Sequence, residues 1–306
     1  MHVWRIHLNN GVVPPKTRKD LIQFCFQRHA IGVGWDEITT HGDENSIREQ
    51  AKQAYGSGYL AGFKAVNAMR KMEVGDLIWT YVKERKTYYL CRVKNTWANR
   101  VYFPEQSGLD IGNYVSVDWT PIGNQQMIPG AVLRSFAYNS SAQGISDIEN
   151  ISKAYWNRYA GHTLYGAEHL KESDIWNVLL PESVEEVVLL YLQFEKHLAI
   201  LSGTLKQDAP VYECVMKDAD GNHYYPQVKS GHFQLNASDY LSTVQKDPNA
   251  HVYLFAASQD YGGGAAVHER IHCLTKEEIE TFMRKRWKSL SEQTGISLDF
   301  CHFQHD

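Results

Sequence analysis

Residues 211–231, VYECVMKDADGNHYYPQVKSG, constrain the fold of this chain most strongly because they have the pattern of a β-hairpin. One strand is predicted from Val211 to Lys217 and the other from Tyr224 to Lys229. The Asp and Gly residues between them tolerate the backbone angles that a tight turn requires. The sequence therefore predicts two antiparallel strands at this point of the chain.

The side chains on each face of this hairpin depend on its loop. Side chains alternate along a strand, so Gln227 and Lys229 share one face and Val228 takes the other. A three-residue loop centred near residues 219–220 sets Glu213 opposite Gln227, whereas a two-residue turn sets it opposite Val228. In the first register a carboxylate, an amide oxygen and an ammonium group converge. Oxygen ligands of this kind suit a hard cation, and the lysine can hold an attacking water or a phosphate.

This hairpin resembles the core of the PD-(D/E)xK nucleases, in the variant of the Mrr-like restriction endonucleases whose third-strand motif is QxK. The resemblance covers roughly residues 180–290 and implies an α/β nuclease core with a central mixed sheet. It implies that Glu213 takes the place of the first metal-binding acid, usually Asp, and Gln227 that of the second. Lys229 is the motif lysine. Because Gln227 is neutral, the hairpin has one carboxylate fewer than the family pattern.

The resemblance also implies ligands from outside the second strand. Mrr-like enzymes often carry a glutamate in the first helix, and Glu185 matches it, with Glu186 as the alternative. Asp208 is an alternative to Glu213 as the first acid. The implied cofactor is Mg²⁺ or Mn²⁺, held by Glu213, Gln227 and Glu185.

Apolar periodicity predicts the elements around the hairpin. Pro181 and Ser183 mark the start of a strongly apolar helix, and Thr275 caps a helix that is expected to run to about Gln293. The other predicted elements are a strand at 198–202, a helix at 237–245, a strand at 251–257 and a strand at 271–274. This order matches the nuclease core.

The N-terminal part of the chain resembles a different family. The stretch IGVGW at 31–35, a helical insertion, and then VGDLIWTY at 74–81 followed by YYLCRV at 88–93 resemble the PUA-like superfold, in its EVE and YTH-like branches. Those domains bind a flipped modified base in an aromatic pocket. The resemblance implies a small, partly open β-barrel with helices.

A flipped base needs flat aromatic faces in place of its neighbours and a polar group that reads its edge. Trp35 is the first candidate wall because Gly32 and Gly34 permit close approach, and Asp36 is positioned to read an exocyclic amine. The other candidates for base binding are Trp79, Tyr81 and Trp97.

These readings predict two domains of mixed α/β and α+β class. Residues 1–160 form the PUA-like recognition domain, 161–178 a linker, and 179–306 the Mrr-like nuclease domain. The net charge of −4 is not that of a strongly basic DNA-binding protein, so nucleic acid has to contact local basic patches. One such patch is Arg284-Lys285-Arg286 with Lys288.

The five cysteines are scattered, with no CxxC pair, which predicts a reducing cytoplasm and no structural zinc. The sequence has no signal-peptide pattern and no apolar run of the roughly 18 residues that span a bilayer, so no membrane association is expected.

The leading hypothesis is a modification-dependent, type IV-like DNA restriction endonuclease that acts in anti-phage defence. It flips and reads a modified base in double-stranded DNA and hydrolyses phosphodiester bonds with a divalent metal. A homodimer is expected because cutting both strands usually takes two active sites. The alternatives are a catalytically inactive nuclease-fold protein that binds modified nucleic acid, and a reader of modified RNA.

Overall fold

The chain forms two compact units, Met1–Leu170 and Lys171–Asp306, and each is described by itself. The division falls inside the stretch 161–178 that was predicted as a linker. The structure is a computed structural model, and it describes residues 1–38, 42–96, 103–166, 170–204, 212–262 and 267–304. Among these residues no helix combines the length and the apolar composition needed to cross a bilayer.

The first unit is built on a curled, six-stranded half-barrel sheet with the strand order β2-β5-β4-β3-β1-β6. Only the β1–β3 pair is parallel. Its elements are β1 Val3–Ile6, α1 Arg18–Gln27, β2 Ala30–Val33, α2 Glu44–Tyr55, α3 Tyr59–Arg70, β3 Leu77–Val82, β4 Thr87–Asn95, β5 Asn113–Gly123, α4 Gly130–Ser135, β6 Ala142–Gly144 and α5 Glu149–Tyr159.

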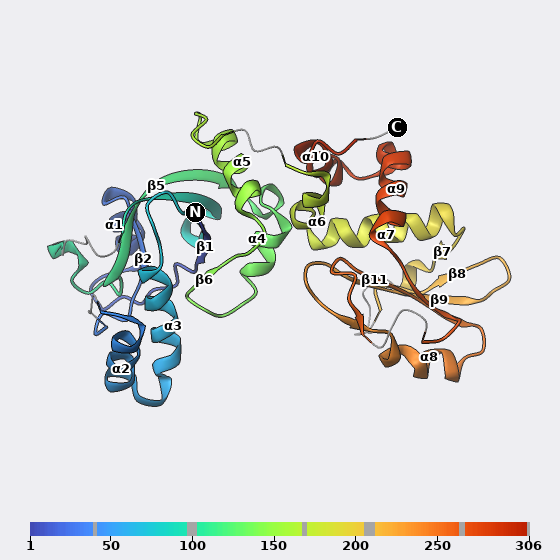
Figure 1. Cartoon of the computed structure of the whole chain (residues 1–306), viewed down its shortest axis with the longest axis horizontal. Coiled ribbons are helices and arrows are strands. Elements are labelled where there is room, and N and C mark those ends of the chain that lie inside the picture. Colours follow the sequence, from blue (N-terminus) through green and yellow to red (C-terminus); the bar gives the residue numbers. More distant parts are fainter. Residues whose placement is uncertain (39–41, 97–102, 167–169, 205–211, 263–266, 305–306) are drawn as a thin grey trace. The chain divides into compact units, whose positions relative to one another are not determined.

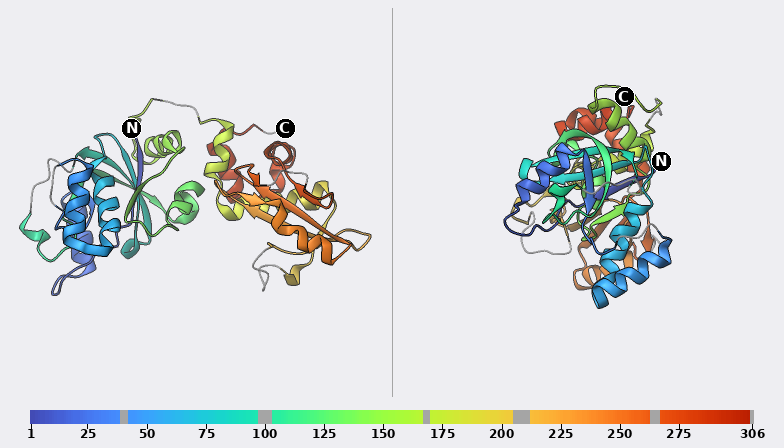
Figure 2. Two further views of the ribbon diagram at one scale, coloured as in Figure 1. Left: turned by 60° about the horizontal axis from the view of Figure 1, so that its bottom comes forward. Right: turned by 90° about the vertical axis from the view of Figure 1, so that its left-hand side faces the viewer.

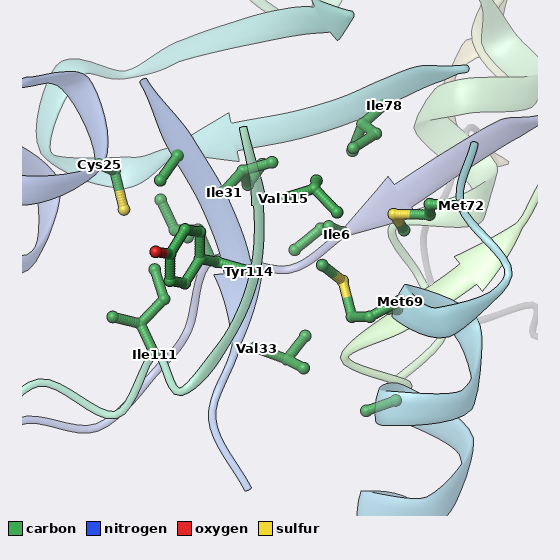
Figure 3. Close-up of a cluster of buried hydrophobic side chains, with 14 of the residues drawn as sticks. Ile6, Cys25, Ile31, Val33, Met69, Met72, Ile78, Ile111, Tyr114 and Val115 are labelled. Atoms are coloured by element: carbon green, nitrogen blue, oxygen red, sulfur yellow. The ribbon is translucent and has the colours of Figure 1, made fainter. Parts of the chain in front are cut away.

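Helices cover both faces of this sheet. The left view of Figure 2 shows the blue α2–α3 pair on one side of the strands and the green α4 and α5 on the other. Between the sheet and α3 lies an apolar core, where Figure 3 shows Ile6, Ile31 and Val115 from three strands beside Met69 of α3. All four of these side chains are fully buried. The first unit is therefore a mixed α/β body with its main core on the α3 side.

The second unit contains a five-stranded sheet with the order β13-β11-β9-β8-β7 and a short β10–β12 pair. Its elements are α6 Ile175–Val178, α7 Pro181–Glu195, β7 Ala199–Ile200, β8 Met216–Lys217, β9 His223–Lys229, β10 Leu235–Asn236, α8 Leu241–Lys246, β11 Ala250–Ala256, β12 Tyr261–Gly262, β13 Ile271–Cys273, α9 Lys276–Arg286 and α10 Glu292–Phe300. The pairs β7–β8 and β8–β9 are antiparallel, whereas the pairs β9–β11 and β11–β13 are parallel.

Two helices pack on opposite faces of this sheet, α7 above it and α8 below it in Figure 1. Helix α7 begins with Pro181 at its first position and buries the apolar stripe that includes Val184, Val187, Val188 and Tyr191. The α8 face is packed by Val252 and Leu254 of β11.

Helix α9 is shorter than the sequence predicts. The Thr275–Glu278 capping box forms as expected, but α9 ends at Arg286, and a separate helix, α10, begins after Ser291. Ser291 caps α10 with its own side chain, which accepts a hydrogen bond from the backbone N–H of Thr294. A single helix to Gln293 is therefore wrong, because the chain contains a second helix start.

Candidate functional site

The hairpin has the register that a three-residue loop produces. Met216 pairs with Tyr224 and Lys217 with His223, the register that would set Glu213 opposite Gln227 if it continued. Beyond Met216 the backbone pairing slips by one residue, since the N–H of Glu213 donates to the carbonyl oxygen of Pro226 at 3.0 Å, but the side chains of Glu213 and Gln227 still meet. The first strand is shorter than predicted, however, since only two of its residues, Met216 and Lys217, are in β8.

The short strand has a local cause. The backbone N–H of Val215 donates to the Thr204 hydroxyl at 2.9 Å. In a longer strand this N–H would instead bond to a backbone carbonyl oxygen of β9. Residues 212–215 therefore run beside β9 without regular strand structure, and Val211 lies outside the described residues.

Glu213 and Gln227 are in direct contact. Gln227 Nε2 donates to Glu213 Oε1 at 3.2 Å, and the backbone N–H of Val228 lies 3.4 Å from the same oxygen. The Gln227 side chain is buried, whereas Lys229, two residues further on the same face, is exposed at the end of β9. The result is a buried amide against a carboxylate, with the exposed Lys229 two residues further along β9.

Cys214 indicates where Glu185 lies. Burial, and then the charges of Glu185 and Glu213, raise the pKa of the Cys214 thiol to about 11. Glu185 of α7 is thus close enough for its charge to act on the residue next to Glu213. The sequence does not predict that Cys214 is buried at this point, because no motif around it distinguishes it from the other scattered cysteines.

The neighbouring Glu186 has a different role. Its carboxylate accepts hydrogen bonds of 2.7 Å from the Ser291 N–H, the Ser291 hydroxyl and the Thr294 hydroxyl. These bonds hold the first turn of α10 against α7. Glu186 is therefore engaged with α10, whereas the charge of Glu185 contributes to the raised pKa of Cys214.

The described residues contain no group of three His, Cys, Asp or Glu side chains that could hold a metal ion. The alternative acid, Asp208, lies outside them. The oxygen donors that do meet are those of Glu213 and Gln227, and the Gln227 amide has to turn its oxygen toward a cation to become a ligand. Mg²⁺ commonly binds through one or two carboxylates and completes its shell with water and phosphate, and Glu213 supplies one such carboxylate.

In the first unit, Asp36 lines a pocket of about 890 Å³ together with Glu37, Tyr55, Asp110 and Tyr114. Trp35 does not line this pocket. Its ring meets Tyr55 edge-on, with centroids 4.9 Å apart, and packs over Gly62 of α3. Trp35 therefore lies behind Tyr55, which is the aromatic group at the pocket wall.

Two glycines fix two of these carboxylates. A Cβ atom at Gly34 would lie 1.7 Å from Asp110 Oδ1, and one at Gly112 would lie 2.3 Å from Asp36 Oδ1. The backbone N–H of Gly112 also donates to Asp36 Oδ1 at 2.6 Å. Asp110 thus packs on Gly34, two residues before Asp36, and Asp36 packs on Gly112, two residues after Asp110. Asp110 was missed, although Gly-Trp-Asp at 34–36 and Asp-Ile-Gly at 110–112 mirror one another in sequence.

The carboxylates give the pocket an acidic character. Burial, followed by the charges of Glu37, Asp36 and Asp110, raises the pKa of Tyr55. Among the described residues, the pocket lining contains no Lys, Arg or His. Such a wall accepts hydrogen bonds and disfavours phosphate.

Two of the remaining base-binding candidates, Trp79 and Tyr81, do not line this pocket. Trp79 is fully buried, its indole N–H donates to the Ser152 hydroxyl of α5 at 3.0 Å, and its ring contacts Tyr155. Tyr81, two residues along β3, projects from the same face as Trp79 and packs on Tyr88. Trp97 lies outside the described residues. Trp79 is a core residue with no face open to a base, and neither Trp79 nor Tyr81 lines the pocket beside Asp36.

Comparison of the chain with protein-family models, with curated proteins and with solved structures found no match.

Proposed function

We propose that this chain is a divalent-metal-dependent DNA endonuclease that recognises a modified base, in the manner of restriction enzymes that defend against phage. The observation that carries the proposal is the second unit's hairpin. Glu213 meets Gln227 there, and Lys229 stands two residues further on the same face. This is the arrangement that the Mrr-like PD-(D/E)xK resemblance implies.

The topology of the second unit supports this proposal. The order α7, β7, β8, β9, α8, β11 is a helix, three antiparallel strands, a helix and a strand parallel to the third. The motif residues stand on the third strand, as in the nuclease core. The curled sheet of the first unit, flanked by helices, is likewise compatible with a PUA-like reader.

Each side chain has a chemical role in this proposal. Lys229, exposed at the strand end, neutralises charge on the phosphate and orients the attacking water. Glu213 and Gln227 supply oxygen ligands, and Glu185 adds negative charge from α7. When bound, Mg²⁺ polarises the phosphate and lowers the pKa of a water. Two copies acting as a homodimer cut both strands.

The pocket beside Asp36 is the proposed site of the flipped base. Its volume accommodates a nucleobase, and Tyr55 and Tyr114 supply aromatic surface. Asp36 and Asp110 accept hydrogen bonds from amino groups on the base edge. Because the wall is acidic, the phosphates have to stay outside while the base enters.

A second candidate function is binding of modified DNA or RNA without cleavage. The favouring observation is that the hairpin contributes one carboxylate, whose partner is a neutral amide. A cleavage screen separates the two functions. Duplexes that carry 5-methylcytosine, 5-hydroxymethylcytosine or N6-methyladenine, and matched unmodified duplexes and RNA strands, are incubated with Mg²⁺ or with chelator. Cutting of a modified duplex in Mg²⁺ supports the nuclease, whereas tight binding with no cutting supports the second function.

A further inference from the structure

The loop that leaves the motif strand carries an exposed aromatic side chain. Phe233 follows Lys229 by four residues and is 51% exposed, with His232 and Gln234 exposed on either side of it. An exposed Phe costs free energy in water, since apolar surface is favoured inside a protein. Single exposed apolar side chains are ordinary on a protein surface, so what distinguishes Phe233 is its place next to the proposed catalytic lysine.

The loop is held in place by hydrogen bonds. The carbonyl oxygen of Phe233 accepts a bond of 2.6 Å from the Ser258 hydroxyl. Gln234 Nε2 donates to Asp260 Oδ1 at 2.9 Å, and the backbone N–H of Leu235 donates to the Asp260 carbonyl oxygen at 3.0 Å. Leu235 is buried in the core between α8 and the sheet. The Phe233 backbone is thus fixed while its ring remains exposed.

The same bracing fixes Phe233 close to Lys229. The carbonyl oxygen of Lys229 accepts from the backbone N–H of Ala257 at 2.8 Å, and that of Phe233 accepts from the next residue, Ser258. Ala257 and Ser258 are adjacent, and consecutive Cα atoms are about 3.8 Å apart. The backbones of Lys229 and Phe233, which these two residues bind, are therefore held close together. A DNA strand rises about 3.4 Å per nucleotide. When one of its phosphates lies at Lys229, a base that is at most a few nucleotides away therefore lies near Phe233.

We propose that Phe233 inserts into the base stack of DNA next to the phosphodiester that Lys229 contacts. Apolar wedges of this kind partly unstack a base step and bend the duplex. The ring gains stacking on a base, while its fixed backbone avoids the cost of ordering a loop on binding. This inference rests on the proposed function, because it takes the hairpin to be where DNA binds.

The test compares Phe233→Ala with Phe194→Ala in the full chain. Phe194, near the end of α7, is 41% exposed and packs on Phe282, so it is a matched exposed phenylalanine in the same unit. Affinity is measured by fluorescence anisotropy on a duplex that the wild type cuts or binds, with Ca²⁺ in place of Mg²⁺. A 2-aminopurine placed at successive steps around the site reports unstacking.

We expect Phe233→Ala to weaken binding about tenfold, in line with the loss of one base–aromatic stack, and to abolish the fluorescence rise at one step. Phe233→Trp should retain both, and Phe194→Ala should resemble the wild type. A Phe233→Ala protein that binds and unstacks DNA like the wild type overturns the wedge and leaves the nuclease proposal standing. A wild type that neither binds nor cuts any of the duplexes overturns both. Equal melting temperatures of the two alanine variants exclude misfolding as the cause.

Discussion

At the scale of single residues, the contact between Glu213 and Gln227 sets the charge of the proposed metal site. A second carboxylate at position 227 would lie about where the Gln227 amide nitrogen now stands, 3.2 Å from Glu213 Oε1. Two carboxylates at such a distance repel one another unless a proton or a cation lies between them. The neutral amide avoids this repulsion in the metal-free protein.

Gln227→Glu should therefore make stability depend on metal. In chelator we expect a loss of about 1 kcal/mol or more, or roughly 3–5 °C in melting temperature, and Mg²⁺ should restore it. Thermal unfolding with Mg²⁺ and with chelator measures both effects. The swapped double variant Glu213→Gln/Gln227→Glu, with one carboxylate and one amide again, should recover stability without metal. If the melting temperature of Gln227→Glu is the same with Mg²⁺ and with chelator, the pair does not bind the ion.

The acidic pocket is also determined by single residues. In Gly34→Ala the new Cβ would lie 1.7 Å from Asp110 Oδ1, so the carboxylate has to move. We expect at least about a fivefold loss of preference for the modified duplex, since one hydrogen bond to the base edge is worth about 1 kcal/mol or more. Competition binding with modified and unmodified duplexes measures it. Gly58→Ala is the control, because no atom lies within 4 Å of its added Cβ. Equal preference in both variants would contradict the assignment of the pocket.

At the scale of elements, α7 carries two adjacent glutamates with different tasks. Glu186 holds the first turn of α10, whereas the charge of Glu185 acts on Cys214 beside the hairpin. The sequence pair Glu-Glu does not distinguish them, because the difference arises from contacts with residues far along the chain.

Substitution of Glu186 should mainly lower stability, whereas substitution of Glu185 should mainly lower activity. Glu186→Gln should lower the free energy of unfolding by about 1–2 kcal/mol, since it weakens a helix cap. Glu185→Gln should slow phosphodiester cleavage and lower the free energy of unfolding by less than Glu186→Gln does. Urea unfolding and single-turnover cleavage measure the pair. The reverse pattern would assign the catalytic carboxylate to Glu186.

Elements with local signals could be predicted from the sequence, and those that depend on distant contacts could not. The hairpin register follows from its loop, and the start of α7 follows from Pro181 and an apolar stripe. The role of Trp79 is different. Its face of β3 is covered by α5, and Ser152, which its indole contacts, lies 73 residues away. Alternation predicts that Trp79 and Tyr81 share a face but not which helix covers that face.

At the scale of the whole molecule, charge is balanced locally. The basic end of α9 is paired, with Arg284 bonded to Glu172 at 2.6 Å and Lys285 to Glu195 at 3.1 Å. With a net charge of −4, the chain lacks a long-range attraction for DNA. Recognition of one modified base and the few contacts at the hairpin then have to supply the selectivity for a target duplex.

In the proposed mechanism, Lys229 and its neighbours hydrolyse modified DNA. The most direct measurement is the single-turnover cleavage rate of the modified and the unmodified duplex in Mg²⁺, for the wild type, Lys229→Ala and Lys246→Ala. Lys246 is an exposed lysine in the last turn of α8 in the same unit, outside the basic patch of α9, and serves as the control. We predict cutting of the modified duplex alone, a rate at least about 100-fold lower in Lys229→Ala, and an unchanged rate in Lys246→Ala. A Lys229→Ala protein that cuts as fast as the wild type would contradict it.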